Sequence, residues 1–178
     1  MALSAHIFKV NLTLANIDEQ HYQDYRLTLA QHPSETDHRL VIRVAAFALF
    51  AHEEPEFSKG LCVDEEPDLW THSPTGEVLH WIELGQPSDK RIRQALSKAA
   101  KVTFIGYNAT KFKQWLGGLD AKTRSNAKLQ ILFLEAIGSD KPEALAQKTM
   151  NLTCTIQEEQ ILLSSDAAQA SWNLTRPN

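Results

Sequence analysis

The chain has 178 residues, of which 43% are hydrophobic, and it carries a net charge of −4 at pH 7. This balance suits a single globular domain over residues 1–178, and no stretch reaches the roughly 20 apolar residues of a membrane span. The N-terminus lacks the features of a signal peptide, and the two cysteines, Cys62 and Cys154, have no near partner in sequence. We therefore expect free thiols and a cytoplasmic protein with no membrane partner.

Apolar and polar residues alternate through most of the first 30 positions. Residues 4–15 place Phe8, Val10 and Leu12 two positions apart, and residues 22–30 show the same period. A period of two is typical of a half-buried strand. The residues between the two segments, Asn-Ile-Asp-Glu, suit a turn, so the pattern predicts a long N-terminal β-hairpin.

A long apolar segment follows the hairpin. Residues 38–52 are apolar almost all round a helix, residues 34–37 supply N-cap side chains, and Pro55 ends the segment. A run of this length that contains Ala and Leu predicts a mostly buried helix rather than a strand.

Acidic residues concentrate after this helix. Residues 53–68 hold seven Asp or Glu against one lysine. A strand is predicted around residues 67–70 and a second around residues 81–84, joined by a Ser-Pro-Thr-Gly turn. Each strand carries one acid, Asp68 on the first and Glu83 on the second.

A tight hairpin would bring these two carboxylates close together. Close carboxylates repel one another, and a divalent cation is the usual remedy. Mg²⁺ prefers oxygen ligands and keeps several waters, so Asp68, Glu83 and a backbone carbonyl from Leu84 would suffice. Such a cation activates water and neutralises charge on a phosphate. The pair therefore predicts a Mg²⁺ site for phosphodiester chemistry.

The second half of the chain alternates helices and strands only in its middle. The predicted elements are a helix over residues 88–100, a buried strand over 101–107, a short helix to residue 116 that two glycines stop, a strand over 129–134, a short helix from residue 140, and a hairpin from strands 151–156 and 160–164. The fold class is thus α/β, with one mixed sheet flanked by helices and not a doubly wound fold.

Basic residues concentrate in the same half. Residues 88–128 hold ten Lys or Arg against two Asp, a net charge of +8, which leaves −12 on the rest of the chain. A basic segment beside an acidic centre suits an enzyme that acts on nucleic acid, because Lys and Arg bind the phosphate backbone. An uneven, solvated surface would show the same pattern.

The acidic strands also carry a family resemblance. The pattern resembles the PD-(D/E)xK nuclease superfamily, in which Asp follows Pro on one strand and Glu-x-Lys lies on the next. Here Asp68 follows Pro67, and Glu83 begins the second half. Over nearly the whole chain the resemblance is closer to a bacterial family of unassigned function, the YaeQ-like proteins, through the hairpin, the Trp-Ile-Glu-Leu-Gly-Gln-Pro stretch and the Tyr-Asn step at residues 107–108. It implies a restriction-endonuclease-like core.

The superfamily's lysine is missing, because Gly85 occupies its position. The predicted helix begins three residues later and could supply a cation. Lys90 is the titratable candidate for this catalytic role, since arginine is locked positive and suits phosphate contacts instead. Arg91, Arg93 and Gln94 are predicted to bind the substrate.

Other interpretations of the same residues stay open. Asp68 could cap a turn, and Glu83 could form a structural ion pair with Arg91 or Arg93. The functions that fit are a Mg²⁺-dependent enzyme acting on DNA or RNA, a non-catalytic nucleic-acid-binding or protein-interaction module that kept the nuclease fold, and a small-molecule phosphoesterase. The sequence leaves the substrate and the oligomeric state undecided.

Overall fold

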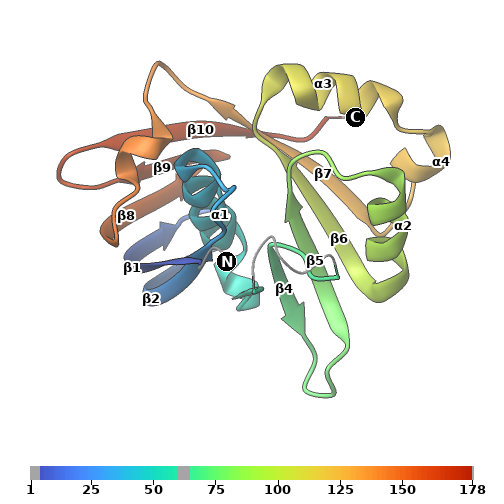
Figure 1. The fold of residues 1–178 in the computed structure, drawn as a ribbon, viewed down its shortest axis with the longest axis horizontal. Coiled ribbons are helices and arrows are strands. Elements are labelled where there is room, and N and C mark those ends of the chain that lie inside the picture. The colour runs from blue at the N-terminus through green and yellow to red at the C-terminus, as the bar shows by residue number, and fades with distance from the viewer. Residues whose placement is uncertain (1–4, 60–64, 178) are drawn as a thin grey trace.

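The computed structural model describes residues 5–59 and 65–177 (Figure 1). Cys62 and Asp64, which belong to the predicted acidic loop, lie outside the described residues. Cys154 is a buried free cysteine, and burial raises the pKa of its thiol to about 12, so the thiol stays protonated. No helix in the described ranges is long and apolar enough to span a membrane.

Ten strands of the described chain form one mixed sheet in the order β2-β1-β8-β9-β10-β7-β6-β5-β4-β3. β1 pairs parallel with β8, and β5, β6 and β7 are parallel to one another, while the remaining pairs are antiparallel. The bounds are β1 His6–Asn16, β2 His21–Gln31, β3 Glu56–Phe57, β4 Leu69–His72, β5 Val78–Leu84, β6 Ala99–Gly106, β7 Leu129–Ala136, β8 Thr149–Gln157, β9 Gln160–Ser164 and β10 Gln169–Thr175.

Four α-helices and two 3₁₀ turns complete the described residues. They are α1 Asp37–Phe50, α2 Asp89–Lys98, α3 Ala109–Gly118 and α4 Ala121–Arg124, with η1 Ala51–Glu53 and η2 Pro142–Leu145. The mixed α/β class and the N-terminal hairpin of β1 and β2 are confirmed.

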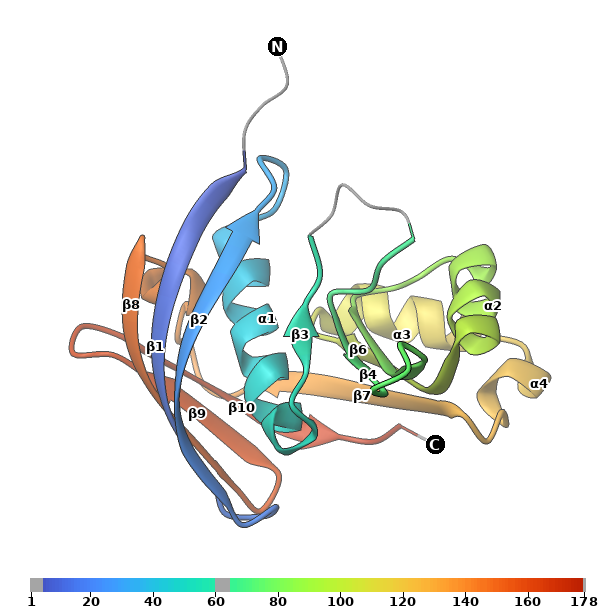
Figure 2. The same cartoon turned by 90° about the horizontal axis from the view of Figure 1, so that it is seen from below.

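The buried helix α1 organises the first core. The Thr36 side chain accepts a hydrogen bond from the backbone N–H of Arg39 and so caps the helix. Every residue of α1 from Leu40 onward is buried. The curved sheet nearly closes around the helix, with β1 and β2 on one side of it and β3 on the other (Figure 2). Enclosure on all sides explains why the helix is apolar all round.

A second core lies on the opposite face of β5 and β6. There Ile92 and Ala95 of α2 and Leu119 after α3 pack against Trp81, Val102 and Phe104. Alternation along the strands separates the two cores, because Ile82 and Leu84 of β5 face the first core while Trp81 faces the second. The Ser88 side chain caps α2 by accepting from the backbone N–H of Arg91.

Some elements differ from the sequence-based expectation. Asp68 lies in a bend just before β4 rather than within the strand, and α3 includes both glycines that were expected to stop it. The short strand β3, helix α4 and strand β10 were not predicted. In β10, Ala170, Trp172 and Leu174 are buried at alternate positions, because one face of the strand packs into the first core.

Candidate functional site

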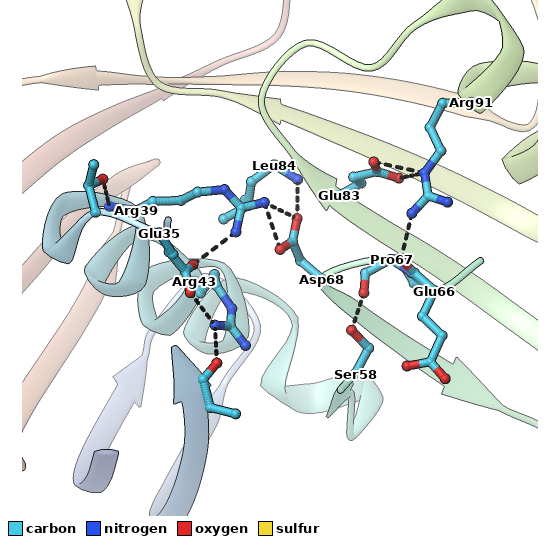
Figure 3. Close-up of polar contacts among 12 residues, drawn as sticks. Glu35, Arg39, Arg43, Ser58, Glu66, Pro67, Asp68, Glu83, Leu84 and Arg91 are labelled. Carbon is cyan, nitrogen blue, oxygen red and sulfur yellow. Dashed lines mark hydrogen bonds and ion pairs between the residues drawn. The ribbon is translucent and has the colours of Figure 1, made fainter. Parts of the chain in front are cut away.

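Asp68 is held at the start of β4 by contacts from two other elements. The Nη2 atom of Arg39, in the first turn of α1, donates to both carboxylate oxygens of Asp68 at 2.8 and 2.9 Å. The backbone N–H of Leu84, at the end of β5, donates to Oδ2 at 2.8 Å. The carboxylate is 7% exposed. These bonds fix its orientation toward α1 (Figure 3).

Arg39 extends this contact into a buried charge network. Its Nη1 donates to Glu35 at 2.9 Å, and the other Glu35 oxygen accepts from Arg43 at 3.0 Å. The Glu35 and Arg43 side chains are each 1% exposed. Burial would lower the pKa of Arg39, but the Asp68 and Glu35 charges outweigh burial and raise that pKa above its ordinary value.

Glu83 on β5 has its own arginine. Nε of Arg91, in α2, donates to both Glu83 oxygens at 2.9 and 3.0 Å, and the indole N–H of Trp81 donates to Oε2 at 2.8 Å. The guanidinium stacks 4.8 Å from the Trp81 ring centroid and also donates to the backbone carbonyl of Glu66. Burial raises the pKa of Glu83, while Trp81 and Arg91 oppose that shift.

Asp68 and Glu83 lie at neighbouring strand ends, but their carboxylates pair with different helices, Asp68 with α1 and Glu83 with α2. Leu69 pairs with Ile82 in the antiparallel register, so the residue before Leu69, Asp68, and the residue after Ile82, Glu83, lie next to this last pair. The Asp68 charge reaches far enough to contribute to the raised pKa of Glu83. Figure 3 nevertheless shows the Asp68 carboxylate turned toward Arg39 and the Glu83 carboxylate turned toward Arg91. Sharing one cation therefore requires one carboxylate to leave its arginine.

The remaining predicted site residues lie along α2. Lys90 and Arg93 are exposed, and no contact in the described part of the chain joins Lys90 to Glu83. The cation beside Glu83 is Arg91, which the sequence assigned to substrate binding. Gln94 is half-buried and accepts from Nη1 of Arg91 at 3.3 Å. The structure thus brings Arg91 and Gln94 to the carboxylates and leaves the role of Lys90 a prediction.

Gly85 has a backbone reason to stand where the superfamily has lysine. Its φ is +97°, a region that side chains rarely adopt, although a Cβ there would meet no atom within 4 Å. Its N–H donates to the carbonyl of Ile105 at 2.9 Å and ends β5 in this geometry. A side chain would have room but would strain the backbone by on the order of 1–3 kcal/mol.

The carboxylate oxygens of Asp68 and Glu83 are already largely occupied. A carboxylate has about four acceptor positions, and Asp68 and Glu83 each use three of them in the contacts above. Within residues 5–59 and 65–177, no group of three His, Cys, Asp or Glu side chains is placed to hold a metal ion. Mg²⁺ commonly binds through one or two carboxylates plus substrate phosphates. Asp68 and Glu83 therefore offer a cation two carboxylates, each of which is already paired with an arginine.

Comparison with known proteins identifies the family. The family model described as YaeQ protein matches residues 1–174. The chain belongs to the YaeQ family. A relative in Escherichia coli (strain K12), named Uncharacterized protein YaeQ, is 38% identical over 175 residues, which cover 98% of this chain and 97% of that protein.

Two solved structures share the YaeQ fold with this chain. The crystal structure of YaeQ protein from Xanthomonas axonopodis pv. citri has a TM-score of 0.91 at 33% identity and covers 98% of this chain and 99% of that chain. The YaeQ protein from Pseudomonas syringae has a TM-score of 0.86 at 26% identity, with 98% and 96% covered. The arrangement that positions Asp68 and Glu83 is thus a YaeQ fold.

Sequence reasoning missed two members of the candidate site, Glu35 and Arg39. A signal for them was present, because α1 carries two arginines in an otherwise apolar segment. Arginine is almost never buried without an acidic partner. Glu35 also lies just before the N-cap Thr36, four residues ahead of Arg39, a spacing that suits an ion pair with the first turn of the helix.

A second polar cluster lies at the other end of α1 in this YaeQ chain. His80 is 1% exposed and bridges Glu53, at 2.6 Å, and Thr103, at 2.7 Å. Burial lowers the pKa of His80. Glu53 and Lys101 also line a cavity of about 380 Å³. His80, Glu53 and Lys101 are each paired within the cluster, so we interpret it as structural packing.

Proposed function

We propose that this chain is a variant member of the PD-(D/E)xK superfamily, with a restriction-endonuclease-like core, and that it hydrolyses phosphodiesters of nucleic acid with Mg²⁺. The observation that carries the proposal is the placement of Asp68 and Glu83 at neighbouring ends of two paired strands, with the Arg91 guanidinium in contact with Glu83. Carboxylates and a cation at one point are the parts that such chemistry needs.

Each residue has a role in this proposal. Asp68 and Glu83 hold the metal ion, with the carbonyl of Leu84 as a further oxygen ligand. A bound Mg²⁺ would supply an activated water and neutralise charge on the phosphate. Arg91 takes the place of the lysine missing at Gly85 as a phosphate-binding cation, because its planar fork matches phosphate oxygens. Arginine is not a general base, so the carboxylates and the metal ion carry that part of the chemistry.

The surface beside Glu83 supports nucleic acid as the substrate. The helices α2, α3 and α4 follow β5 and β6 and form the outer layer on the Glu83 side (Figure 1). Their exposed cations are Lys90, Arg93, Lys98, Lys111, Lys113, Lys122 and Arg124. A phosphate backbone that crosses this layer would reach the N-terminus of α2, where helix N–H groups favour phosphate.

The proposal is tested by cleavage of end-labelled single-stranded DNA, duplex DNA and RNA with Mg²⁺ or Mn²⁺. We expect cleavage of at least one substrate, and its loss on chelation by EDTA. Arg91→Gln should lower the rate by about 100-fold, the usual effect of losing one charge-stabilising donor. Lys90→Ala should lower it by less than about tenfold, because Lys90 is solvent-exposed. Absence of cleavage with every substrate and both metals would overturn the proposal.

A second candidate is a non-catalytic nucleic-acid-binding module with the same fold. The observation that favours it is that Arg39 and Arg91 already neutralise Asp68 and Glu83. Paired charges of this kind serve structure as well as catalysis.

For the module we expect weak, salt-dependent binding of nucleic acid, because it relies on a local basic layer in an acidic protein. Fluorescence anisotropy should show the affinity falling by at least about tenfold between roughly 50 and 200 mM salt. Binding that ignores salt, or no binding at low salt, would count against the basic layer as a phosphate surface.

A further inference from the structure

The charges around the candidate site cancel. Three carboxylates and three guanidinium groups, all buried or half-buried, form ion pairs of 3.0 Å or less. Four of these side chains form one network around Arg39, and the other two form the pair of Glu83 and Arg91. The six side chains are Glu35, Asp68, Glu83, Arg39, Arg43 and Arg91. A cation that enters this cluster meets arginines as well as carboxylates, so the cluster without substrate is a poor cation site.

Two arginines contact the proposed metal-binding carboxylates, Arg39 at Asp68 and Arg91 at Glu83, and Arg39 is the one that is held in place. It bridges two carboxylates, Glu35 and Asp68, at 2.8 to 2.9 Å. Glu35 is in turn held by Arg43, whose side chain is almost entirely buried. Moving Arg39 would leave buried charges without partners, which is strongly unfavourable. Arg39 therefore keeps Asp68 in position.

Arg91 has a different setting. It lies in the first turn of α2, a ten-residue helix whose N-terminus is exposed at Ser88 and Asp89. Backbone N–H groups at such a terminus favour a phosphate, and a phosphate there would lie beside Arg91. Its described partners include one carboxylate, Glu83, together with the neutral oxygens of Glu66 and Gln94. A phosphodiester offers the guanidinium a second anion of matching shape.

We propose that Arg91 is an exchangeable counterion that pairs with Glu83 until a phosphodiester draws it away, so that the divalent cation and the phosphodiester bind this site together. The inference rests on the proposed function and adds that binding of the cation depends on binding of the phosphodiester. When Arg91 turns to the phosphate, Glu83 loses its guanidinium and becomes free to turn toward Asp68. The phosphate also completes the oxygen ligands that two carboxylates leave unfilled.

The coupling is reciprocal. If the phosphodiester raises the affinity for the cation, the cation raises the affinity for the phosphodiester by the same factor. Removing the Arg91 charge should therefore have two opposite effects. The cation alone should bind more tightly, because Glu83 no longer has a competing partner. The increase in cation affinity that the phosphodiester causes should shrink, because no guanidinium at position 91 has to leave Glu83.

Calorimetric titration with Mn²⁺ measures both effects. The proteins are wild type, Arg91→Gln and, as a matched control, Arg26→Gln on the exposed side of β2. Each is titrated alone and with a short single-stranded phosphorothioate oligodeoxynucleotide, which resists cleavage. We expect the oligonucleotide to tighten Mn²⁺ binding to wild type and to Arg26→Gln by about tenfold or more, within the usual range of coupling between two sites.

Arg91→Gln alone should bind Mn²⁺ at least about tenfold more tightly than wild type alone, and the oligonucleotide should add less than about threefold. Equal or weaker Mn²⁺ binding by Arg91→Gln would overturn the inference, while measurable binding to wild type would leave the proposed function standing. No Mn²⁺ binding by any variant, with or without oligonucleotide, would overturn both. Thermal unfolding of each variant confirms that the titrated protein is folded.

Discussion

Asp68→Asn is expected to abolish metal-dependent cleavage, with a loss of at least about 1,000-fold, while the protein stays folded. The amide has the shape of the carboxylate and can still accept one bond from Arg39 or from the Leu84 N–H. It lacks the negative charge that a hard cation requires. Arg39 keeps its bond to Glu35, so the free energy of unfolding should fall by only about 1–3 kcal/mol.

Single-turnover cleavage and urea unfolding measure the two effects of this substitution. Asp24→Asn, at an exposed position of β2, is the matched control and should change neither quantity. Undiminished cleavage by Asp68→Asn would show that the activity comes from a contaminating nuclease or from another site. A collapse of the fold would show that the Asp68 charge is chiefly structural.

The parts of the fold that depend on local pattern were predictable. The hairpin follows from period-two alternation, and its inward residues Val10, Leu12 and Leu14 are buried. The starts of α1 and α2 follow from capping side chains, because Thr36 and Ser88 each accept a backbone hydrogen bond there. These signals act over a few residues, so the sequence displays them directly.

Parts that depend on distant pairing were not predictable from pattern alone. β1 pairs parallel with β8, although about 140 residues separate Asn11 from its partner Asn151. β10 has a buried alternating face, but its place between β9 and β7 is decided by long-range pairing. Strands that are neighbours in the sheet can be far apart in the sequence, and local residue patterns do not indicate which of them pair.

The candidate site divides in the same way. Strand patterns placed Asp68 and Glu83 on neighbouring strands; Glu83 lies within β5, whereas Asp68 lies in the bend that precedes its partner strand β4. The Glu83–Arg91 ion pair was one of the interpretations that the sequence left open, but the partner of Asp68 was missed, because Arg39 comes from α1 and only the fold brings it to Asp68. Lys90 and Arg91 are adjacent in α2, and the rotation of the helix decides that Arg91 faces Glu83 while Lys90 faces solvent.

Replacing Glu35 is expected to lower the stability of the protein strongly. The two Glu35 oxygens accept from Arg39 and Arg43, and its side chain is 1% exposed. Glu35→Gln would leave the Arg43 guanidinium buried without a negative partner, which typically costs about 3–5 kcal/mol of unfolding free energy. Urea or guanidinium unfolding measures this loss. Glu135→Gln, at an exposed position of β7, should stay within about 0.5 kcal/mol of wild type.

A double substitution separates the buried charge from the loss of a hydrogen bond. In the described residues, Nε and Nη2 of Arg43 have no hydrogen-bond partner, so Arg43 already depends on Glu35 and on the Ala30 carbonyl. Arg43→Met removes the stranded charge. Glu35→Gln combined with Arg43→Met should therefore be more stable than Glu35→Gln alone by at least about 1 kcal/mol, a coupling typical of residues in one network. If the double variant is instead less stable than Glu35→Gln, the Arg43 charge does not depend on Glu35, and the network does not hold Arg39 against Asp68 in the way described.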